Sequence, residues 1–166
     1  MRRRGGGFTL VELMVTVAVM AVLAAVGTPF ARQWIDSNRQ MQARNLMWEA
    51  VSQTRALALR NPGQVAGPAP AARLQSNQGA LQVTWGEADE VYWQGQLPNG
   101  AALRLTNTED FSDAQALMDS GSHLDCVAFG NRGQRLPAAT GCSTAAIHGR
   151  IAIGLNDQEP LYVDLL

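Results

Sequence analysis

The stretch Gly7-Phe8-Thr9-Leu10-Val11-Glu12-Leu13 opens the most apolar part of this 166-residue chain. The 19 residues from Leu13 to Ala31 carry no charge. A run of 18 or more residues of this kind is long enough for a helix to span a bilayer. The rest of the chain has the composition of one ordinary soluble domain. The sequence therefore predicts a membrane segment joined to a single domain, and it excludes a purely cytosolic protein.

Three arginines, Arg2 to Arg4, stand directly before this run. The positive-inside rule places such a terminus in the cytoplasm and the rest of the chain on the exported side. Two kinds of segment fit this pattern. One is a secretory signal peptide, cleaved near Val22-Leu23-Ala24, and the other is an anchor that is retained.

Glu12 favours the retained anchor. A carboxylate in a membrane span costs about 2.5–3.5 kcal/mol at the helix centre and less near its end. A disposable signal peptide has no use for such a residue, whereas a retained helix gains if the carboxylate later meets a cation. The alternative is that Glu12 lies at the membrane surface and stays hydrated.

The segment Gly7 to Leu13, with its basic leader and long apolar run, closely resembles the class III signal of type IV pilins and pseudopilins. Pro29 falls at position 22 counted from Phe8, where that family commonly has a helix-kinking proline. The resemblance implies that a prepilin peptidase cuts after Gly7 and that the new amino terminus of Phe8 is methylated. It also implies that Glu12 neutralises the amino-terminal charge of a neighbouring subunit during assembly.

Residues 32–61 are predicted to continue the same helix beyond the membrane, because good helix formers dominate up to the stop Asn61-Pro62-Gly63. The expected buried face is Met47, Ala50, Val51, Thr54, Leu57 and Ala58, and the arginines are expected to be solvated. The proline is expected to kink the helix or melt it locally, because helical sequence resumes at once. Residues 51–61 also resemble the helix end of GspH/FimT-type pseudopilins, which is the less specific of the two matches.

Residues 62–80 are predicted to be a loop or linker, since Pro, Ala and Gly dominate over 64–79. From residue 81 the apolar period changes to two, which predicts strands over 81–85, 90–93, 102–105, 124–129, 146–153 and 161–165. A turn is expected at 97–100, and a short helix over 111–118 with Ser112 or Asp110 as its cap. The prediction is an α+β protein, with a long helix packed on an antiparallel β domain over 81–166, as the pilin-like fold implies.

Cys126 and Cys142 fall in the exported part, where thiols are oxidised. A bridge between them would contribute about 3 kcal/mol by closing a loop of about 15 residues. Free thiols and a metal pair are the alternatives. The role expected for the bridge is structural.

The sequence shows no constellation typical of an enzyme. His123 and His148 lack the spacing of metal ligands, and the acids Glu109, Asp110, Asp113, Asp119 and Asp125 lack the period of a calcium loop. No metal, cofactor or catalytic site is predicted. An enzyme would become a serious reading only if the fold brought both histidines and an acid into one cleft.

A DNA-binding role is the second alternative, since some FimT-type minor pilins bind DNA through arginines. The candidates here are Arg132 and Arg135 on a glycine-rich loop and Arg150 in a strand. Against this role, the chain has no lysine, its tail is acidic, and loss of residues 1–7 leaves 10 basic against 14 acidic side chains.

The sequence thus predicts a minor pseudopilin of the GspH/FimT type in the type II secretion system of a Gram-negative bacterium. The alternative is a minor pilin of a type IV pilus. The resemblance implies a single-pass inner-membrane protein with a periplasmic domain, which helps prime assembly near the filament tip. The implied partners are other pilins, the prepilin peptidase and the inner-membrane assembly platform.

Overall fold

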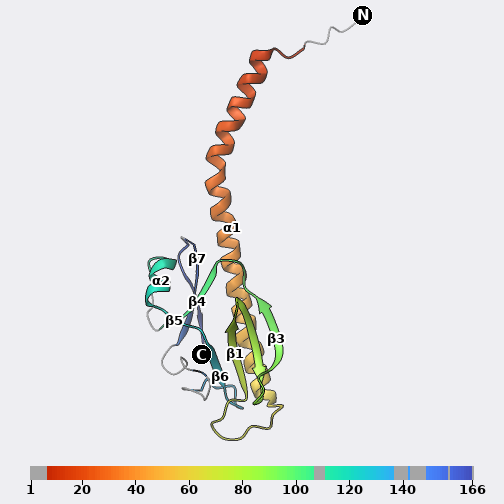
Figure 1. The fold of residues 1–166 in the computed structure, drawn as a ribbon, viewed down its shortest axis with the longest axis vertical. Coiled ribbons are helices and arrows are strands. Elements are labelled where there is room, and N and C mark those ends of the chain that lie inside the picture. The colour runs from red at the N-terminus through yellow and green to blue at the C-terminus, as the bar shows by residue number, and fades with distance from the viewer. Residues whose placement is uncertain (1–6, 107–110, 137–141, 143–148, 157, 166) are drawn as a thin grey trace, which may run out of the picture. The chain divides into compact units, whose positions relative to one another are not determined.

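The computed structural model describes residues 7–106, 111–136, 142, 149–156 and 158–165 (Figure 1). The helices are α1 (Leu10–Arg60) and α2 (Ala114–Ser120). The strands are β1 (Ala72–Asn77), β2 (Ala80–Trp85), β3 (Glu90–Gln96), β4 (Ala101–Thr106), β5 (Ser122–His123), β6 (Cys126–Phe129), β7 (Arg150–Leu155) and β8 (Leu161–Asp164). The chain forms two compact units, Met1–Ile35 and Asp36–Leu166, and α1 contributes to both.

The second half of α1 is amphipathic and buries one face in the domain. Its buried residues are Gln40, Ala43, Met47, Ala50, Val51, Thr54, Leu57 and Ala58. This set contains every residue expected on the buried face from helical spacing. The helix ends where the sequence predicts: Asn61 takes a positive φ of 46° and its side chain bonds both the backbone N and O of Val65.

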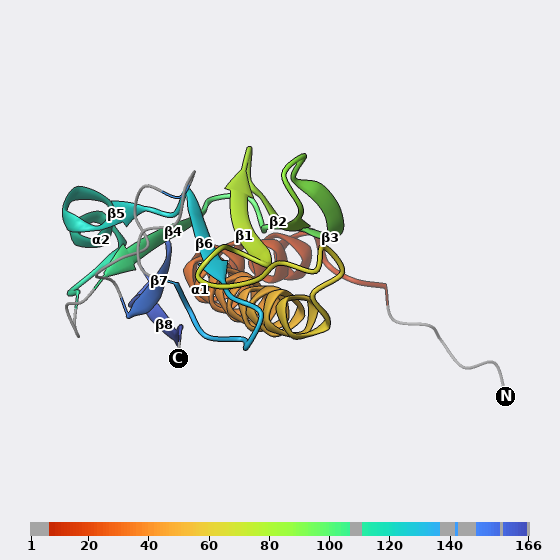
Figure 2. The same ribbon diagram turned by 90° about the horizontal axis from the view of Figure 1, so that it is seen from below.

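In the described part of the chain, eight strands form two four-stranded sheets. The order is β3-β2-β1-β6 in the first sheet and β5-β4-β7-β8 in the second, and every pair of neighbours is antiparallel. Figure 2 looks along α1 and shows the labelled strands on one side of its carboxyl-terminal half. The predicted α+β class, with a long helix packed on an antiparallel β domain, is therefore confirmed.

The core lies between this half of α1 and the inner faces of the strands. In the second sheet, alternate residues point inward, so that Leu103, Leu105, Ile151, Ile153 and Val163 join the helix side chains in one cluster. A buried amide ties the layers together, because Gln40 Nε2 donates to the carbonyl oxygens of Ile153 at 3.0 Å and of Glu159 at 2.7 Å. The small helix α2 packs on β4 and β7.

Two predictions were wrong in part. The proposed linker contains a strand, because Ala72–Asn77 forms β1 and pairs with both β2 and β6. The short helix was placed too early, since α2 begins at Ala114 and its cap is Asp113, which accepts from the backbone N of Ala116 at 2.8 Å. Residues 146–148 of one predicted strand lie outside the described part of the chain.

Candidate functional site

The amino-terminal end of α1 is closed by a capping box. Thr9 precedes the first helical residue, and its Oγ1 accepts from the backbone N of Glu12 at 3.2 Å. In return, the backbone N of Thr9 donates to Glu12 Oε2 at 3.5 Å. This reciprocal pair is the arrangement that a Thr-x-x-Glu sequence favours, because it satisfies two backbone donors that the helix cannot. The carboxylate of Glu12 is therefore directed towards the start of its own chain.

The bond between Gly7 and Phe8 lies outside regular secondary structure. Residues 7–9 precede the helix and are exposed, with Phe8 83% exposed. A Cβ atom built on Gly7 would meet no described atom within 4 Å. The described structure around Gly7 therefore leaves room for a larger side chain at this position.

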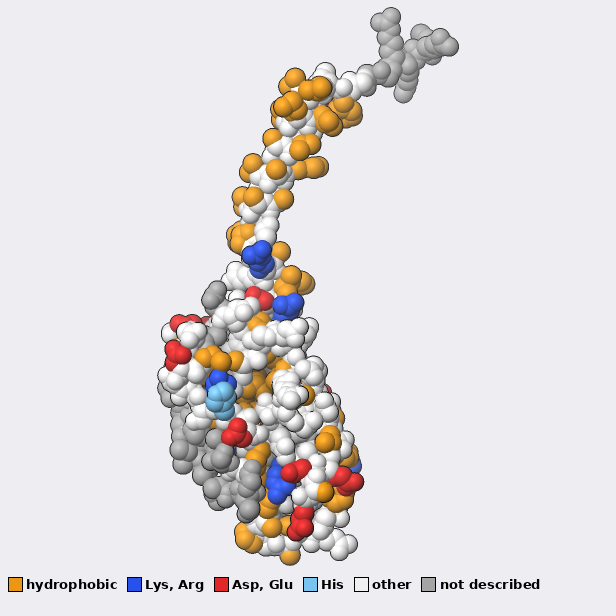
Figure 3. All heavy atoms as spheres, viewed as in Figure 1, with side chains coloured by type: hydrophobic (Ala, Val, Ile, Leu, Met, Phe, Trp, Pro, Cys, Tyr) orange, Lys and Arg blue, Asp and Glu red, His pale blue; other side chains and the backbone are white. Residues whose placement is uncertain are grey.

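The first half of α1 carries no charge between Leu13 and Ala31, and every residue from Gly7 to Ile35 is exposed. Figure 3 shows hydrophobic side chains along the visible face of this half. Its large side chains, such as Leu10 at 74% and Met20 at 70%, contact water in the isolated chain. Within the described residues, α1 is the one helix that is long and apolar enough to cross a membrane. A helix that is apolar on every side needs lipid or other protein around it.

Pro29 lies inside α1, which continues without interruption on both sides. The helix is therefore not melted at this residue, and a kink there stays a prediction. Immediately before the proline, Thr28 Oγ1 donates to the carbonyl oxygen of Ala24 at 2.7 Å. Such a bond from a threonine to the preceding turn commonly accompanies bending of a helix.

Cys126 and Cys142 form a disulfide, with their Cα atoms 5.1 Å apart. Both are buried, at 4% and 3% exposure, and they pack with Ala128 and Leu136 in a small second cluster. The bridge ties the segment that follows β6 back to the sheet. Its place in a packed cluster gives it a structural role.

The three candidate DNA-binding arginines do not form one exposed basic patch in the structure. Arg150 is held on β7, where its Nε bonds Asp164 Oδ1 at 2.8 Å and its guanidinium lies over the ring of Tyr162. Arg132 and Arg135 follow β6 in the other sheet, and burial lowers the pKa of the Arg135 guanidinium. Only Arg132 is exposed.

The residues considered for an enzyme are also dispersed. His123 is exposed on β5, Asp113 caps α2, and Asp119 accepts from Gln115 in the same helix. Glu109, Asp110 and His148 lie outside the described residues. In the described part of the chain, no group of three His, Cys, Asp or Glu side chains could hold a metal ion.

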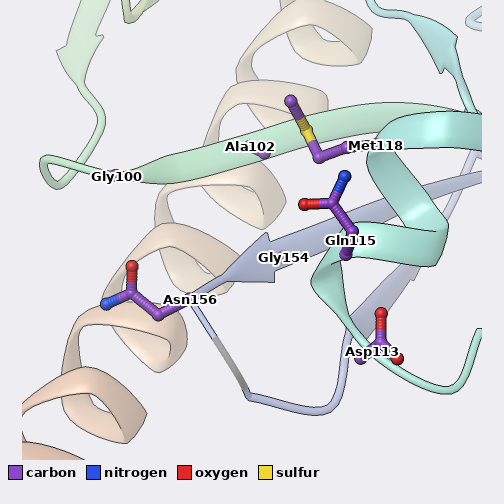
Figure 4. A pocket seen from close by; sticks show the side chains of 7 residues that line it. All are labelled: Gly100, Ala102, Asp113, Gln115, Met118, Gly154 and Asn156. Carbon is purple, nitrogen blue, oxygen red and sulfur yellow. The ribbon is translucent and has the colours of Figure 1, made fainter.

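A pocket of about 530 Å³ lies beside α2 (Figure 4). It is lined by Gly100, Ala102, Asp113, Gln115, Met118, Gly154 and Asn156. Its polar side chains already have partners: Asp113 bonds the backbone of α2, Gln115 bonds Asp119, and Asn156 Nδ2 bonds Asp36 Oδ2. Nothing in this pocket points to a particular ligand, because these polar side chains bond neighbouring protein groups.

Thr9 is the functional residue that the sequence reasoning passed over. The spacing Thr9-Leu10-Val11-Glu12 before an apolar run is itself the signature of a capping box. Neither role expected for Glu12, pairing with a cation or hydration at the membrane surface, includes this bond within the chain.

Comparison with known proteins agrees with this geometry. Residues 2–28 match the family model of the prokaryotic N-terminal methylation motif. Searches of curated proteins and of solved structures returned no significant match. The motif covers the leader, the Gly7–Phe8 bond, the capping box and most of the apolar half of α1. Residues 2–28 thus carry the prokaryotic N-terminal methylation motif of a class III prepilin signal, and this motif, together with the α+β architecture, is consistent with a type IV pilin-like protein.

Proposed function

We propose that the chain is a minor pseudopilin of the GspH/FimT type, a structural and non-enzymatic subunit of a type II secretion pseudopilus. The prepilin peptidase cuts after Gly7, Phe8 becomes the methylated amino terminus, and residues 8–31 hold the subunit in the inner membrane. The observation that carries the proposal is the methylation motif over residues 2–28, most of which lies on the fully exposed apolar half of α1.

Two further observations support processing at Gly7. The Gly7–Phe8 bond precedes the helix, so a peptidase could bind it in an extended form. The described residues leave room for a side chain at position 7, so the fold of this chain does not itself require glycine there. The disulfide supports an exported, oxidising location for the domain.

In the assembled filament, Glu12 pairs with the amino terminus of a neighbouring Phe8. In the free subunit its Oε2 lies 3.5 Å from the backbone N of Thr9, which is a long hydrogen bond. A methylated ammonium group from another subunit is a stronger partner, because both groups are charged. The pairing offsets the desolvation of the carboxylate and selects one position of each subunit along the filament.

The test distinguishes the charge of Glu12 from its part in the capping box. A strain that lacks the gene is complemented with the wild type, with Glu12→Ala and with Glu12→Gln, and processing, filament incorporation and protein secretion are measured. Glutamine keeps an oxygen that can complete the capping box but carries no charge. We expect both variants to be cleaved normally and to be lost from filaments, with secretion impaired.

Incorporation of Glu12→Gln at the wild-type level would show that capping is the need at position 12 and would refute the charge pairing. Loss of surface pili with normal secretion in the deletion strain would instead assign the subunit to a type IV pilus. A gel-shift assay at low salt covers the DNA-binding role of FimT-type pilins: no retardation, or retardation unchanged by Arg132→Ala, excludes it.

A further inference from the structure

The soluble half of α1 has a second face, opposite the one buried in the domain. Met41 and Trp48 are 44% and 46% exposed, and Asn45 and Ser52 between and after them are exposed as well. The steps between these four positions are four, three and four residues, so that Met41 and Trp48, and likewise Asn45 and Ser52, are seven residues apart, as in a heptad repeat. Residues at that spacing form one continuous line along a helix, as in the seam of a coiled coil.

This seam has a defined end. Arg55 and Leu59 continue the same spacing, but they already contact their own domain. The guanidinium of Arg55 lies over the ring of Phe129, 5.5 Å from its centroid. A Cβ built on Gly133 would lie 3.3 Å from the side chain of Leu59. Arg55 is held by its own domain, and it separates Leu59, which is still 60% exposed, from the part of the face that runs from Met41 to Ser52.

Two charges flank the seam on opposite sides. With Met41 and Trp48 at the d positions of a heptad and Asn45 and Ser52 at the a positions, Arg44 falls at g and Glu49 at e. In a parallel coiled coil, g of one helix faces e of the other, five residues further along, and such pairs set the choice of partner. Arg44 of one copy then faces Glu49 of a second copy, and the two-fold axis forms this pair twice.

The charges also fix the register and the direction. A shift by one heptad would place Arg44 opposite Gln42 or Ala56, which are uncharged. An antiparallel pair would place g opposite g and e opposite e, and so would bring like charges together. In the described part of the chain, the buried Nε of Arg44 has no hydrogen-bond partner. A polar Asn45 at an a position favours a two-stranded, in-register pair at some cost in stability.

We propose that two copies of this chain form a parallel, in-register dimer through the Met41–Ser52 seam before they enter a filament. The inference rests on the membrane anchoring proposed above, because anchors of one orientation in one membrane present two seams in parallel. A seam of this length is a weak interface in dilute solution. Confinement to a membrane raises the effective concentration of the second copy and makes such an interface sufficient.

Cysteine cross-linking in the membranes of cells tests the proposal on the full chain. The two native cysteines are paired with each other, so a single introduced cysteine reports its own neighbours. Asn45→Cys and Ser52→Cys are each made in a Glu12→Ala background, in which filaments are not expected. We expect disulfide-linked dimers at both positions, well above those of the matched control Gln53→Cys, which lies at a b position off the seam.

The charge pair is tested by exchange. Arg44→Glu and Glu49→Arg each place like charges together, and we expect each to reduce cross-linking at Asn45→Cys, while the double variant restores it. Two exposed pairs of this kind alter a dimerisation constant by roughly two- to thirtyfold. Failure of the double variant to recover would overturn the assigned register.

Three other outcomes contradict the dimer. One is equal cross-linking at Gln53→Cys. Another is preferential linkage between an Asn45→Cys chain and a Ser52→Cys chain, which indicates staggered helices. The third is cross-linking that requires an intact Glu12, which would place the contact in the filament and leave the proposed function untouched.

Discussion

At the scale of single residues, Glu12 combines a local role with a proposed distant one. Within its own chain it closes the capping box with Thr9, and in a filament it is proposed to bind the amino terminus of another subunit. Breaking the hydrogen bond between the Thr9 backbone N and Glu12 Oε2 costs little free energy, because this bond is long, at 3.5 Å. Capping therefore holds the carboxylate close to the amino terminus without competing strongly with assembly.

Asp113 is the N-cap of α2. Its shifted pKa makes the stability of the folded chain depend on pH. The backbone N–H of Ala116, with help from the Ser112 hydroxyl, lowers the pKa of Asp113 below its ordinary value of 3.8. The folded chain thus holds this proton less tightly than the unfolded chain. The stabilisation is complete above the unfolded pKa and is lost as the pH falls through the folded one.

We expect Asp113→Asn, which caps without titrating, to lose part of the acid sensitivity of wild-type unfolding below about pH 4. Asp113→Ala should be less stable than wild type at neutral pH. Thermal unfolding of the detergent-solubilised chain between pH 3 and pH 7 measures both variants. Parallel curves for wild type and Asp113→Asn would show that the cap charge does not contribute.

At the scale of helices and strands, the sequence predicted the elements that are determined by neighbouring residues in the chain. For the second half of α1, the helical period predicted the buried residues from Met47 to Ala58 and the Asn61-Pro62-Gly63 sequence predicted the helix end, whereas the buried Gln40 and Ala43 were missed. Strand β1 was missed, because Ala72–Asn77 follows a segment rich in Pro, Ala and Gly. What makes it a strand is its pairing with Cys126–Phe129, about 50 residues away, which no local pattern reports.

The functional features also differ in whether the sequence alone could predict them. The methylation motif could be predicted from the sequence, because it consists of consecutive residues. The seam on α1 could not be predicted, because the sequence alone does not show which residues of the helix the domain leaves exposed. Arg44 looked solvated by spacing, whereas its Nε is buried.

The disulfide is the element-scale feature whose removal has the clearest cost. Cys126 on β6 and Cys142 are 16 residues apart in sequence, and a loop of that length corresponds to about 3 kcal/mol in the chain-entropy model. We expect the double variant Cys126→Ser/Cys142→Ser to lose about 2–4 kcal/mol of unfolding free energy in a denaturant titration. Wild type with a reductant should match it. A loss below about 0.5 kcal/mol would mean that the buried cluster holds the segment without the bridge.

At the scale of the whole molecule, the two units of the chain suit different environments: the first is apolar and exposed, and the second has its own buried core. Residues 13–31 carry no charge, and every residue from Gly7 to Ile35 is exposed, so this unit is not stable in water alone. The second unit, by contrast, buries a continuous core of its own. Removal of residues 1–7 would take three arginines with it and leave a mildly acidic subunit.

The mass of the amino-terminal peptide of the mature chain tests this account most directly. We predict a chain that begins at Phe8, has lost residues 1–7, and carries one methyl group on its terminal nitrogen. A chain that begins near Ala25 would be an ordinary secreted protein, and one that keeps Met1 would be a plain membrane anchor. Either result would contradict processing as a prepilin.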